Sequence, residues 1–349
     1  VVVEDGVQRR RVVVAGEDLP NLSDAQILDH VRRGGTIFSR VAPEDKLRIV
    51  ELSQQSGFVV AVTGDGINDA PALKRADIGV AMGVTGTDVA KQSADIILLD
   101  DSFHTLVGAV QQGRTIFRNI QKGTLSCFTS NYAELAANLA SLAAAALFHV
   151  PLAITVMQIL AIDLIAEIFP LAALGRDKAE GQLMREKPRD LKHHILNRIS
   201  ITDFVWAGVL MGLLAFGNYL FFYWRQGLSA SHIEPGSLIH MGATSMTYLT
   251  IVLCQLANIL QRRSEHGIFT RYQLHNRTLW GAYALSLVLV SLIIYSPINT
   301  YFGSAPLGFM DWLWAGVAVV IFIAVREFER HTRNHSRTAL FARHGHETL

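Results

Sequence analysis

Long apolar blocks constrain this chain more than any other feature of its sequence. A helix needs about 20 mostly apolar residues to cross the hydrocarbon core of a bilayer. Six blocks of roughly this kind follow one another, at Leu125–Phe148, Ala153–Leu174, Thr202–Trp224, Leu238–Leu260, Leu279–Pro297 and Trp312–Val325. A buried all-α core is the alternative, but half of the residues are hydrophobic and only 17% are charged. The sequence therefore predicts a multi-pass integral membrane protein with a bundle of six transmembrane helices and the lipid bilayer as a partner.

The polar connectors predict the orientation of these helices. Lys and Arg gather after the second, fourth and sixth blocks, whereas the opposite connectors carry almost none. Cytoplasmic loops of membrane proteins are enriched in Lys and Arg. We therefore expect residues 1–122 to be cytoplasmic, residues 123–330 to form the transmembrane domain, and residues 331–349 to form a basic cytoplasmic tail.

The first third of the chain has the pattern of a soluble α/β domain. Short β-branched runs alternate with helical patterns, which is typical of a doubly wound sheet. The expected strands are Arg11–Val14, Thr36–Arg40, Phe58–Val62, Ile78–Ala81 and Ile96–Leu99. One helix should begin after Ala42, because Pro43 suits the first helical position. A polar helix from Ser102 to Lys122 should lead into the first apolar block.

Composition excludes some classes of function and partner. The net charge of +1 provides no basic excess for nucleic acid, so we expect no nucleic-acid partner. Both cysteines, Cys127 and Cys254, lie in apolar blocks, which offers neither a disulfide framework nor a Cys-based metal site. The sequence opens at Val1 in a strand-like run, so we expect a further segment of the protein upstream.

A glycine-rich string after the strand at Phe58–Val62 carries the clearest chemistry. It reads TGDGINDAPALK from Thr63 to Lys74. Ligands of open α/β sheets bind beyond the carboxyl ends of strands, where Asp65 could hold Mg²⁺ against a phosphate. Lys46 would supply a positive charge for a phosphoryl oxygen. The alternative for an isolated Asp-Gly pair is a surface turn.

The longer string favours the phosphate site over the surface turn. TGDGINDAPALKRADIGVAMG, from Thr63 to Gly83, resembles the hinge motif of P-type ATPases. FSRVAPEDK, from Phe38 to Lys46, and DVAKQSADIILLDDSF with the later QQGR, between Asp88 and Arg114, are also similar to that family. The resemblance covers essentially the whole chain. It implies the end of a HAD-like phosphorylation domain followed by the last six membrane helices.

The resemblance also implies roles for individual residues in the soluble part. Asp65 is expected to bind Mg²⁺, Lys46 and Thr63 to contact the phosphoryl group, and Asn68 and Asp69 to support the same site. Gly64 and Gly66 allow close approach of the backbone to the ligand. The family phosphorylates an aspartate in a DKTGT string and uses a TGES loop, and neither string occurs here. ATP would be bound mainly by a nucleotide domain outside this chain, so we expect the fragment alone to be inactive.

Acidic side chains inside the apolar blocks indicate a second site. An ionised side chain at the bilayer centre costs about 2.5–3.5 kcal/mol on insertion scales, so such a residue suggests a function. Glu134 lies in the first block, with Asn131 and Asn138 on the same helical face, and Asp163 and Glu167 share a face in the second. Pro170 should free the carbonyl of residue 166 as a further oxygen ligand. The alternative is protonated or ion-paired acids with a structural role.

These blocks resemble the ion-site helices of the calcium and sodium–potassium pump group. The similar strings are SNYAE, from Ser130 to Glu134, and QILAIDLIAEIFPLAALGRD, from Gln158 to Asp177. The resemblance implies that the ligands of the transported cation are Asn131, Glu134, Asp163 and Glu167. It extends less strongly to Gln255 and Asn258, which could equally form hydrogen bonds between helices. The cation stays open between Ca²⁺, Na⁺ or K⁺, and a proton relay.

The main hypothesis is therefore part of an ATP-driven pump for inorganic cations. A non-catalytic membrane scaffold or regulatory half-pump is the alternative from another class. A lipid flippase has no need of the clustered acids Glu134, Asp163 and Glu167. A phosphatase fused to a membrane anchor would need its own nucleophilic aspartate, which the sequence does not offer.

Overall fold

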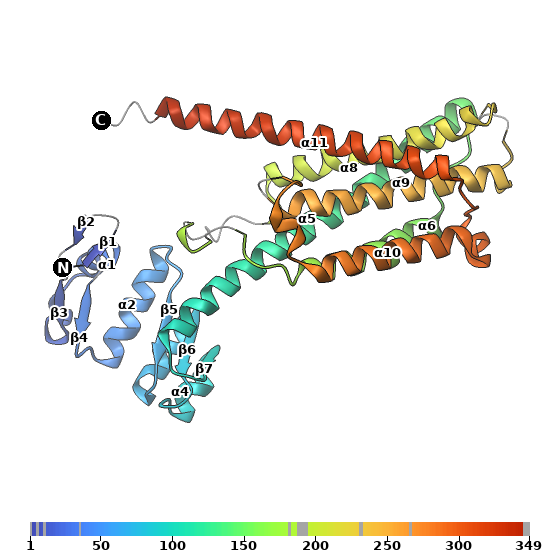
Figure 1. Cartoon of the computed structure of the whole chain (residues 1–349). Helices are drawn as coiled ribbons and strands as arrows, with labels where there is room; N and C mark the ends of the chain where they lie inside the picture. The colour runs from blue at the N-terminus through green and yellow to red at the C-terminus, as the bar shows by residue number, and fades with distance from the viewer. Residues whose placement is uncertain are drawn as a thin grey trace. The chain divides into compact units, whose positions relative to one another are not determined.

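The computed structural model describes residues 2–4, 7–9, 12–34, 36–180, 183–186, 195–229, 233–264 and 267–344. The chain divides into two compact units, Val1–Gln111 and Gln112–Leu349 (Figure 1). The boundary falls within helix α5 (Phe103–Phe148), which contains both the polar helix and the first apolar block that the sequence predicts. Each unit is described on its own below.

The described residues of the first unit form three small sheets, whereas a single doubly wound sheet was expected. Strands β1 (Val2–Glu4) and β2 (Val7–Arg9) are antiparallel, whereas β3 (Val13–Ala15) and β4 (Ile37–Ser39) are parallel. The third sheet is parallel and has the order β5-β6-β7. Its strands are β5 (Ala61–Gly64), β6 (Ile78–Met82) and β7 (Ile96–Leu98). The parallel strands lie at or within three residues of the predicted ones, and the β1–β2 hairpin was not predicted.

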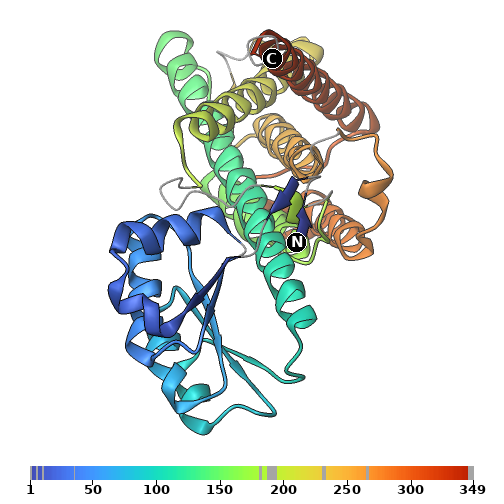
Figure 2. The same cartoon turned by 90° about the vertical axis from the view of Figure 1, so that its left-hand side faces the viewer.

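Short helices pack beside these strands (Figure 2). They are α1 (Asp24–Arg33), α2 (Pro43–Gln55), α3 (Ala70–Arg75) and α4 (Asp88–Ser93), with the 3₁₀ turns η1 (Gly16–Asn21) and η2 (Ile67–Asp69). Ser23 begins α1 with a capping box to Gln26, and Pro43 begins α2 as predicted. One hydrophobic cluster surrounds Leu19 and Ile27, and another surrounds Leu73 and Ala81. The second cluster holds α3 against the three-stranded sheet.

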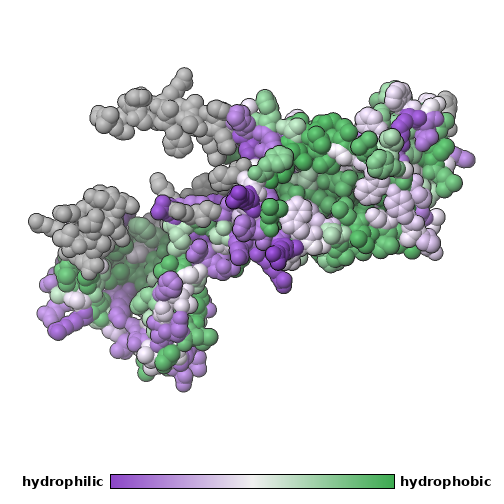
Figure 3. Space-filling model, in the orientation of Figure 1, coloured by the Kyte–Doolittle hydropathy of each residue, from purple (hydrophilic) through white to green (hydrophobic). Residues whose placement is uncertain are grey.

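The second unit is a bundle of long helices with a largely hydrophobic surface (Figure 3). After α5 come α6 (Val156–Ala161), the π-helical segment η3 (Ile162–Glu167), α7 (Ile168–Leu174), η4 (Leu183–Arg185), α8 (Arg198–Arg225), α9 (Leu238–Arg263), η6 (Arg271–Leu274), α10 (Arg277–Tyr295), η7 (Pro297–Phe302) and α11 (Phe309–His344). Within the described residues, five stretches are long and apolar enough to cross a membrane: 156–174, 198–225, 238–263, 277–295 and 309–332. The polar residues of the first block lower its hydropathy, so the count of six spans stays a prediction.

Helix α9 lies at the centre of the bundle. Its apolar stretch is 89% buried, against 22–39% for the other four candidate spans. Helices α8, α11, α10 and α7 and segment η3 all contact it. Glycines let α8 approach α5 closely, since a Cβ on Gly212 would come within 2.3 Å of the carbonyl oxygen of Ala133. Consequently the polar side chains of α9 must find partners inside the protein.

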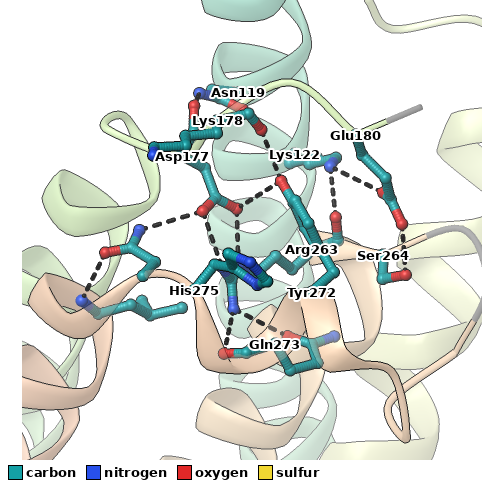
Figure 4. Close-up of polar contacts among 12 residues, drawn as sticks. Asn119, Lys122, Asp177, Lys178, Glu180, Arg263, Ser264, Tyr272, Gln273 and His275 are labelled. Carbon is teal, nitrogen blue, oxygen red and sulfur yellow. Dashed lines mark hydrogen bonds and ion pairs between the residues drawn. The ribbon is translucent and has the colours of Figure 1, made fainter. Parts of the chain in front are cut away.

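One end of α9 is held by a buried ion pair (Figure 4). The guanidinium of Arg263 donates to both carboxylate oxygens of Asp177, at 2.7 and 2.9 Å, and both side chains are almost fully buried. Arg263 also donates to the carbonyl oxygen of Gln273 and lies over the ring of Tyr272. Asn119 of α5 donates to the backbone carbonyl of Asp177 at 2.8 Å. The pair therefore joins α5, the segment after α7, the end of α9 and η6.

We predict that Arg263→Ala destabilises the second unit by roughly 3–5 kcal/mol, because it leaves the carboxylate of Asp177 buried without its cation. Glu186→Gln is the control, since Glu186 forms an exposed ion pair with Arg118 and such pairs contribute about 0–1 kcal/mol. Denaturant unfolding of the protein in detergent measures both. Equal losses of stability in the two variants would contradict the structural role assigned to Arg263.

Candidate functional site

The first group of candidate residues lies at the carboxyl end of β5. Nζ of Lys46, from α2, is 2.7 Å from Oδ1 of Asp69, in η2. The other oxygen of Asp69 accepts the backbone N–H groups of Asp65 and Gly66, at 3.3 and 3.2 Å. Burial alone would raise the pKa of Asp69, but Lys46 and these N–H groups lower it overall. Asp69 thus organises the turn and fixes Lys46 beside it.

Asp65 is left exposed at the strand end while Asp69 is occupied by Lys46 and the backbone. Asn68 is also exposed and Thr63 is partly buried. Mg²⁺ usually keeps several waters and binds through one or two carboxylates together with a substrate phosphate. A single available carboxylate beside a fixed lysine fits that requirement. The structure thus brings Lys46 and Asp69 into contact and leaves Asp65 available to an ion.

Gly64 is required by this arrangement. A Cβ at residue 64 would lie 2.5 Å from the Cβ of Asp69 and 2.9 Å from its carboxylate carbon. At Gly66 the nearest atom, Oδ2 of Asp69, would be 3.5 Å away, which is an ordinary contact. Only the first of the two glycines is therefore demanded by close packing.

Asp101 completes the same edge and was not singled out from the sequence. Its carboxylate accepts the N–H groups of Gly83, Val84 and Thr85, at 2.6, 3.0 and 2.8 Å, and so orders the loop after β6. The same loop reaches Asp65, whose carbonyl oxygen accepts the N–H of Thr87. The hydrogen bond from Val84 leads those that lower the pKa of Asp101 to about 2. The φ of Asp101 is 50°, which is uncommon for a residue other than glycine. This backbone conformation cannot be read from the sequence.

The second group of candidates lies within the helix bundle. Glu134 of α5 is 6% exposed and Glu167 of η3 is 2% exposed. Asp163 is partly buried, and Asn131 is exposed on α5. Within the part of the chain that the structure describes, no three acidic, His or Cys side chains converge as a metal site. The structure therefore buries Glu134 and Glu167 but does not gather all the predicted ligands.

Buried oxygens without a hydrogen bond surround these two acids. Among the described residues they include Oε1 of Glu134, Oε2 of Glu167, and the hydroxyls of Ser126 and Ser130. Ser126, Ser130 and Glu134 stand four residues apart on one face of α5. Leaving one such group unsatisfied costs about 1–3 kcal/mol. A set of orphaned oxygens suits a hard cation, which would satisfy several of them at once.

Segment η3 carries Asp163 and Glu167 and has π-helical hydrogen bonding. Such segments are frequent at functional sites. Pro170 cannot donate to the carbonyl of Ala166, but that oxygen instead accepts the hydroxyl of Ser286, of α10, at 2.8 Å. The carbonyl that the sequence suggested as a ligand is therefore engaged by a neighbouring helix.

Gln255 and Asn258 form hydrogen bonds between and along helices. Gln255 donates to Oε1 of Glu167 at 2.8 Å and to the carbonyl oxygen of Ser126 at 3.0 Å. Asn258 donates to Oε1 of Gln255 at 3.1 Å. Gln255 thus connects α9 with both η3 and α5, and it presents a donor to the acid.

Among the described residues, five helices long and apolar enough to cross a membrane indicate an integral membrane protein. Residues 151–331 match the family described as cation-transporting ATPase, C-terminus. The chain belongs to this family of P-type ATPases and corresponds to its carboxyl-terminal region, which confirms the resemblance found in the sequence.

The similar curated proteins agree with this assignment. The chain is 37% identical to a calcium-transporting ATPase of Bacillus subtilis over 86% of its length, and 34% identical to calcium-transporting ATPase 1 of Bacillus cereus over 90%. It is 32% identical to the potassium-transporting ATPase alpha chain 1 of Xenopus laevis over 91%. These alignments cover 32%, 36% and 34% of the relatives, so the chain spans about a third of their length.

We predict that the amides of Gly83, Val84 and Thr85 stay protected from hydrogen exchange down to about pH 3. The pKa of Asp101 in the folded protein is about 2, below its ordinary value, so its stabilising effect is complete above the ordinary value and disappears as pH falls through 2. Asp101→Asn should expose these amides already at neutral pH, because the charge-assisted bonds are lost.

Asp100→Asn is the control for this measurement. Asp100 is adjacent, but it accepts hydrogen bonds from Ser102 and Thr105 instead. Loss of protection near pH 4 in the unchanged protein, or equal exposure in both variants, would contradict the prediction.

Proposed function

We propose that this chain is part of an ATP-driven pump that moves an inorganic cation across a membrane, and that the cation is Ca²⁺. The observation that carries the proposal is the set of buried, unsatisfied oxygens of Glu134, Glu167, Ser126 and Ser130. Ca²⁺ takes oxygen ligands, including carboxylates, in flexible geometry. Two of the similar proteins are named as calcium transporters, which supports the choice of ion.

The proposed membrane arrangement adds the first block of α5 to the five candidate spans, which makes six. Residues 1–122 and 331–349 would be cytoplasmic, and residues 123–330 would lie in the membrane. The Lys and Arg residues of the connectors support this orientation. Asp163 and Asn131 would join Glu134 and Glu167 as ligands once the cation is bound. Gln255 and Asn258 would act around the site, as argued below.

We further propose that the β5 edge belongs to a HAD-like phosphorylation domain. Asp65 would hold Mg²⁺, Lys46 and Thr63 would contact the phosphoryl group, and Asn68 and Asp69 would support them. Mg²⁺ would neutralise charge on the phosphate oxygens. The nucleophilic aspartate would come from a DKTGT segment, and ATP would bind mainly to a nucleotide domain; this sequence contains no DKTGT string. The chain alone would then not hydrolyse ATP.

Phosphorylation tests the pump. The complete protein in membrane vesicles should form an acid-stable phosphoenzyme from ATP when Ca²⁺ is added. Glu167→Gln should reduce the apparent affinity for Ca²⁺ at least tenfold, because it removes a buried charge from the site. Glu327→Gln, which changes an acid paired with Arg330 on α11, is the control and should change little.

Other outcomes of this experiment distinguish the alternatives. A phosphoenzyme triggered by Na⁺ and discharged by K⁺ would replace Ca²⁺ with monovalent cations. The Xenopus relative is named as a potassium-transporting ATPase. If no cation produced a phosphoenzyme, that result would contradict the proposed pump and favour a membrane scaffold.

The β5 edge provides a separate prediction. Gly64→Ala should reduce Mg²⁺-dependent phosphorylation at least tenfold, because its Cβ would displace the side chain of Asp69 and with it Lys46. Gly66→Ala adds the same methyl group where space exists and should retain most of the activity. The level of phosphoenzyme at saturating cation measures both. Equal activity of the two variants would exclude the proposed role of this turn.

A further inference from the structure

A line of hydrogen bonds runs along α9 from Arg262 to the candidate cation site. Nε of Arg262 donates to Oδ1 of Asn258 at 3.1 Å, and Nδ2 of Asn258 donates to Oε1 of Gln255 at 3.1 Å. Nε2 of Gln255 then donates to Oε1 of Glu167 at 2.8 Å. The side chain of Arg262 is 9% exposed, and the other three residues are at most 2% exposed. Four buried side chains therefore join the end of α9 to the acid.

Arg262 determines the direction of this line. A guanidinium has only donors, whereas an amide has a donor on one side and an acceptor on the other. The oxygen of Asn258 must therefore face Arg262, which turns the nitrogen of Asn258 toward Gln255. That nitrogen in turn requires the oxygen of Gln255, which leaves the nitrogen of Gln255 for Glu167. Reversal of either amide would set donor against donor inside the protein.

Arg262 is itself held by the neighbouring helices. Its two terminal nitrogens donate to Oδ2 of Asp203, on α8, at 2.9 Å and to the hydroxyl of Thr129, on α5, at 2.8 Å. The carboxylate of Asp203 also accepts a hydrogen bond of 3.0 Å from the guanidinium of Arg326, on α11. The guanidinium is thus fixed by two neighbouring helices, α8 and α5, and α11 holds Asp203 in place. The orientation of Asn258 is therefore set from outside the cation site. Gln255 agrees with it at both ends, since its nitrogen also donates to the carbonyl oxygen of Ser126 at 3.0 Å.

We propose that Arg262 is a positioning residue that keeps the amide nitrogen of Gln255, rather than its oxygen, directed at Glu167, and so lowers the affinity of the site for its cation. The N–H of Gln255 supports the carboxylate when no cation is present. At the same time the oxygen of Gln255 is engaged by Asn258 and is withheld from the cation. This inference rests on the proposed function.

The test measures phosphoenzyme formation by the complete protein in membrane vesicles over a range of Ca²⁺ concentrations. Arg262→Met removes the donor to Asn258 and allows the amide of Asn258 to turn away, which releases the oxygen of Gln255 for Ca²⁺. The Ca²⁺ concentration for half-maximal phosphorylation should fall roughly fivefold, about the net value of one hydrogen bond, with the maximal level unchanged. Arg262→Lys, which again supplies only donors, should restore the original value.

Asn258→Leu separates positioning from charge. It keeps the positive charge of Arg262 but breaks the line, so it should give the same fivefold shift. The double variant Arg262→Met, Asn258→Leu should shift no further, because both changes interrupt one network. Gln261→Leu is the matched control, since its buried amide donates to the carbonyl oxygen of Ile323 outside the line. It should leave the half-maximal concentration unchanged.

Several results would overturn the inference. A shift in Arg262→Met without one in Asn258→Leu would mean that the charge of Arg262 acts directly on the cation. If either variant lowered the maximal level of phosphoenzyme without changing the half-maximal Ca²⁺ concentration, Arg262 would have only a structural role. If Arg262→Met does not accumulate in the membrane, Asn258→Leu decides alone. If the unchanged protein forms no cation-dependent phosphoenzyme, the proposed function itself fails.

Discussion

The burial of α9 is the constraint on which the rest of the second unit depends. Inside a bundle, a polar side chain that finds no partner costs free energy, and several polar residues of α9 are paired with other helices or loops. Arg263 is matched by Asp177, Arg262 by Asp203 and Thr129, and Gln255 by Glu167 and Ser126. These contacts define how α5, η3, α8 and the segment after α7 stand around α9. The same requirement makes the unsatisfied oxygens near Glu134 stand out.

The sequence was most informative where a single segment carries its own signal. Five of the six apolar blocks lie in stretches that are long and apolar enough to cross a membrane, because length and hydropathy are local properties. The helix at Pro43–Gln55 and the parallel strands were also predicted, the strand bounds to within three residues. Sheet membership was not, since β3 and β4 pair apart from β5, β6 and β7. Pairing depends on contacts between distant segments, which a local pattern does not contain.

The residues of the candidate sites also differ in how well the sequence alone identifies them. Asp65, Lys46, Glu134 and Glu167 could be proposed as site residues because an acid or a lysine in an unusual context is visible in the sequence, and their roles stay predictions. Asp101 and Arg262 were not, because their importance arises from the groups that surround them: three backbone N–H groups for one, and an amide, an acid and a hydroxyl for the other. The carbonyl of Ala166 illustrates the opposite error. Pro170 does release it, but Ser286 on another helix takes it up.

The two neighbouring arginines of α9 show why burial alone does not identify a functional residue. Arg263 donates to the carboxylate of Asp177 and to the backbone and amide oxygens of Gln273. The amide nitrogen of Gln273 donates to the carbonyl oxygen of Leu260, so this set of hydrogen bonds stays at the end of the bundle. Arg262 also donates to an acid and to an amide, but the amide of Asn258 donates in turn to Gln255, which donates to Glu167. A carboxylate accepts on both oxygens and would end the line at once. The choice of Asn258, and not an acid, next to Arg262 therefore connects the end of α9 with Glu167.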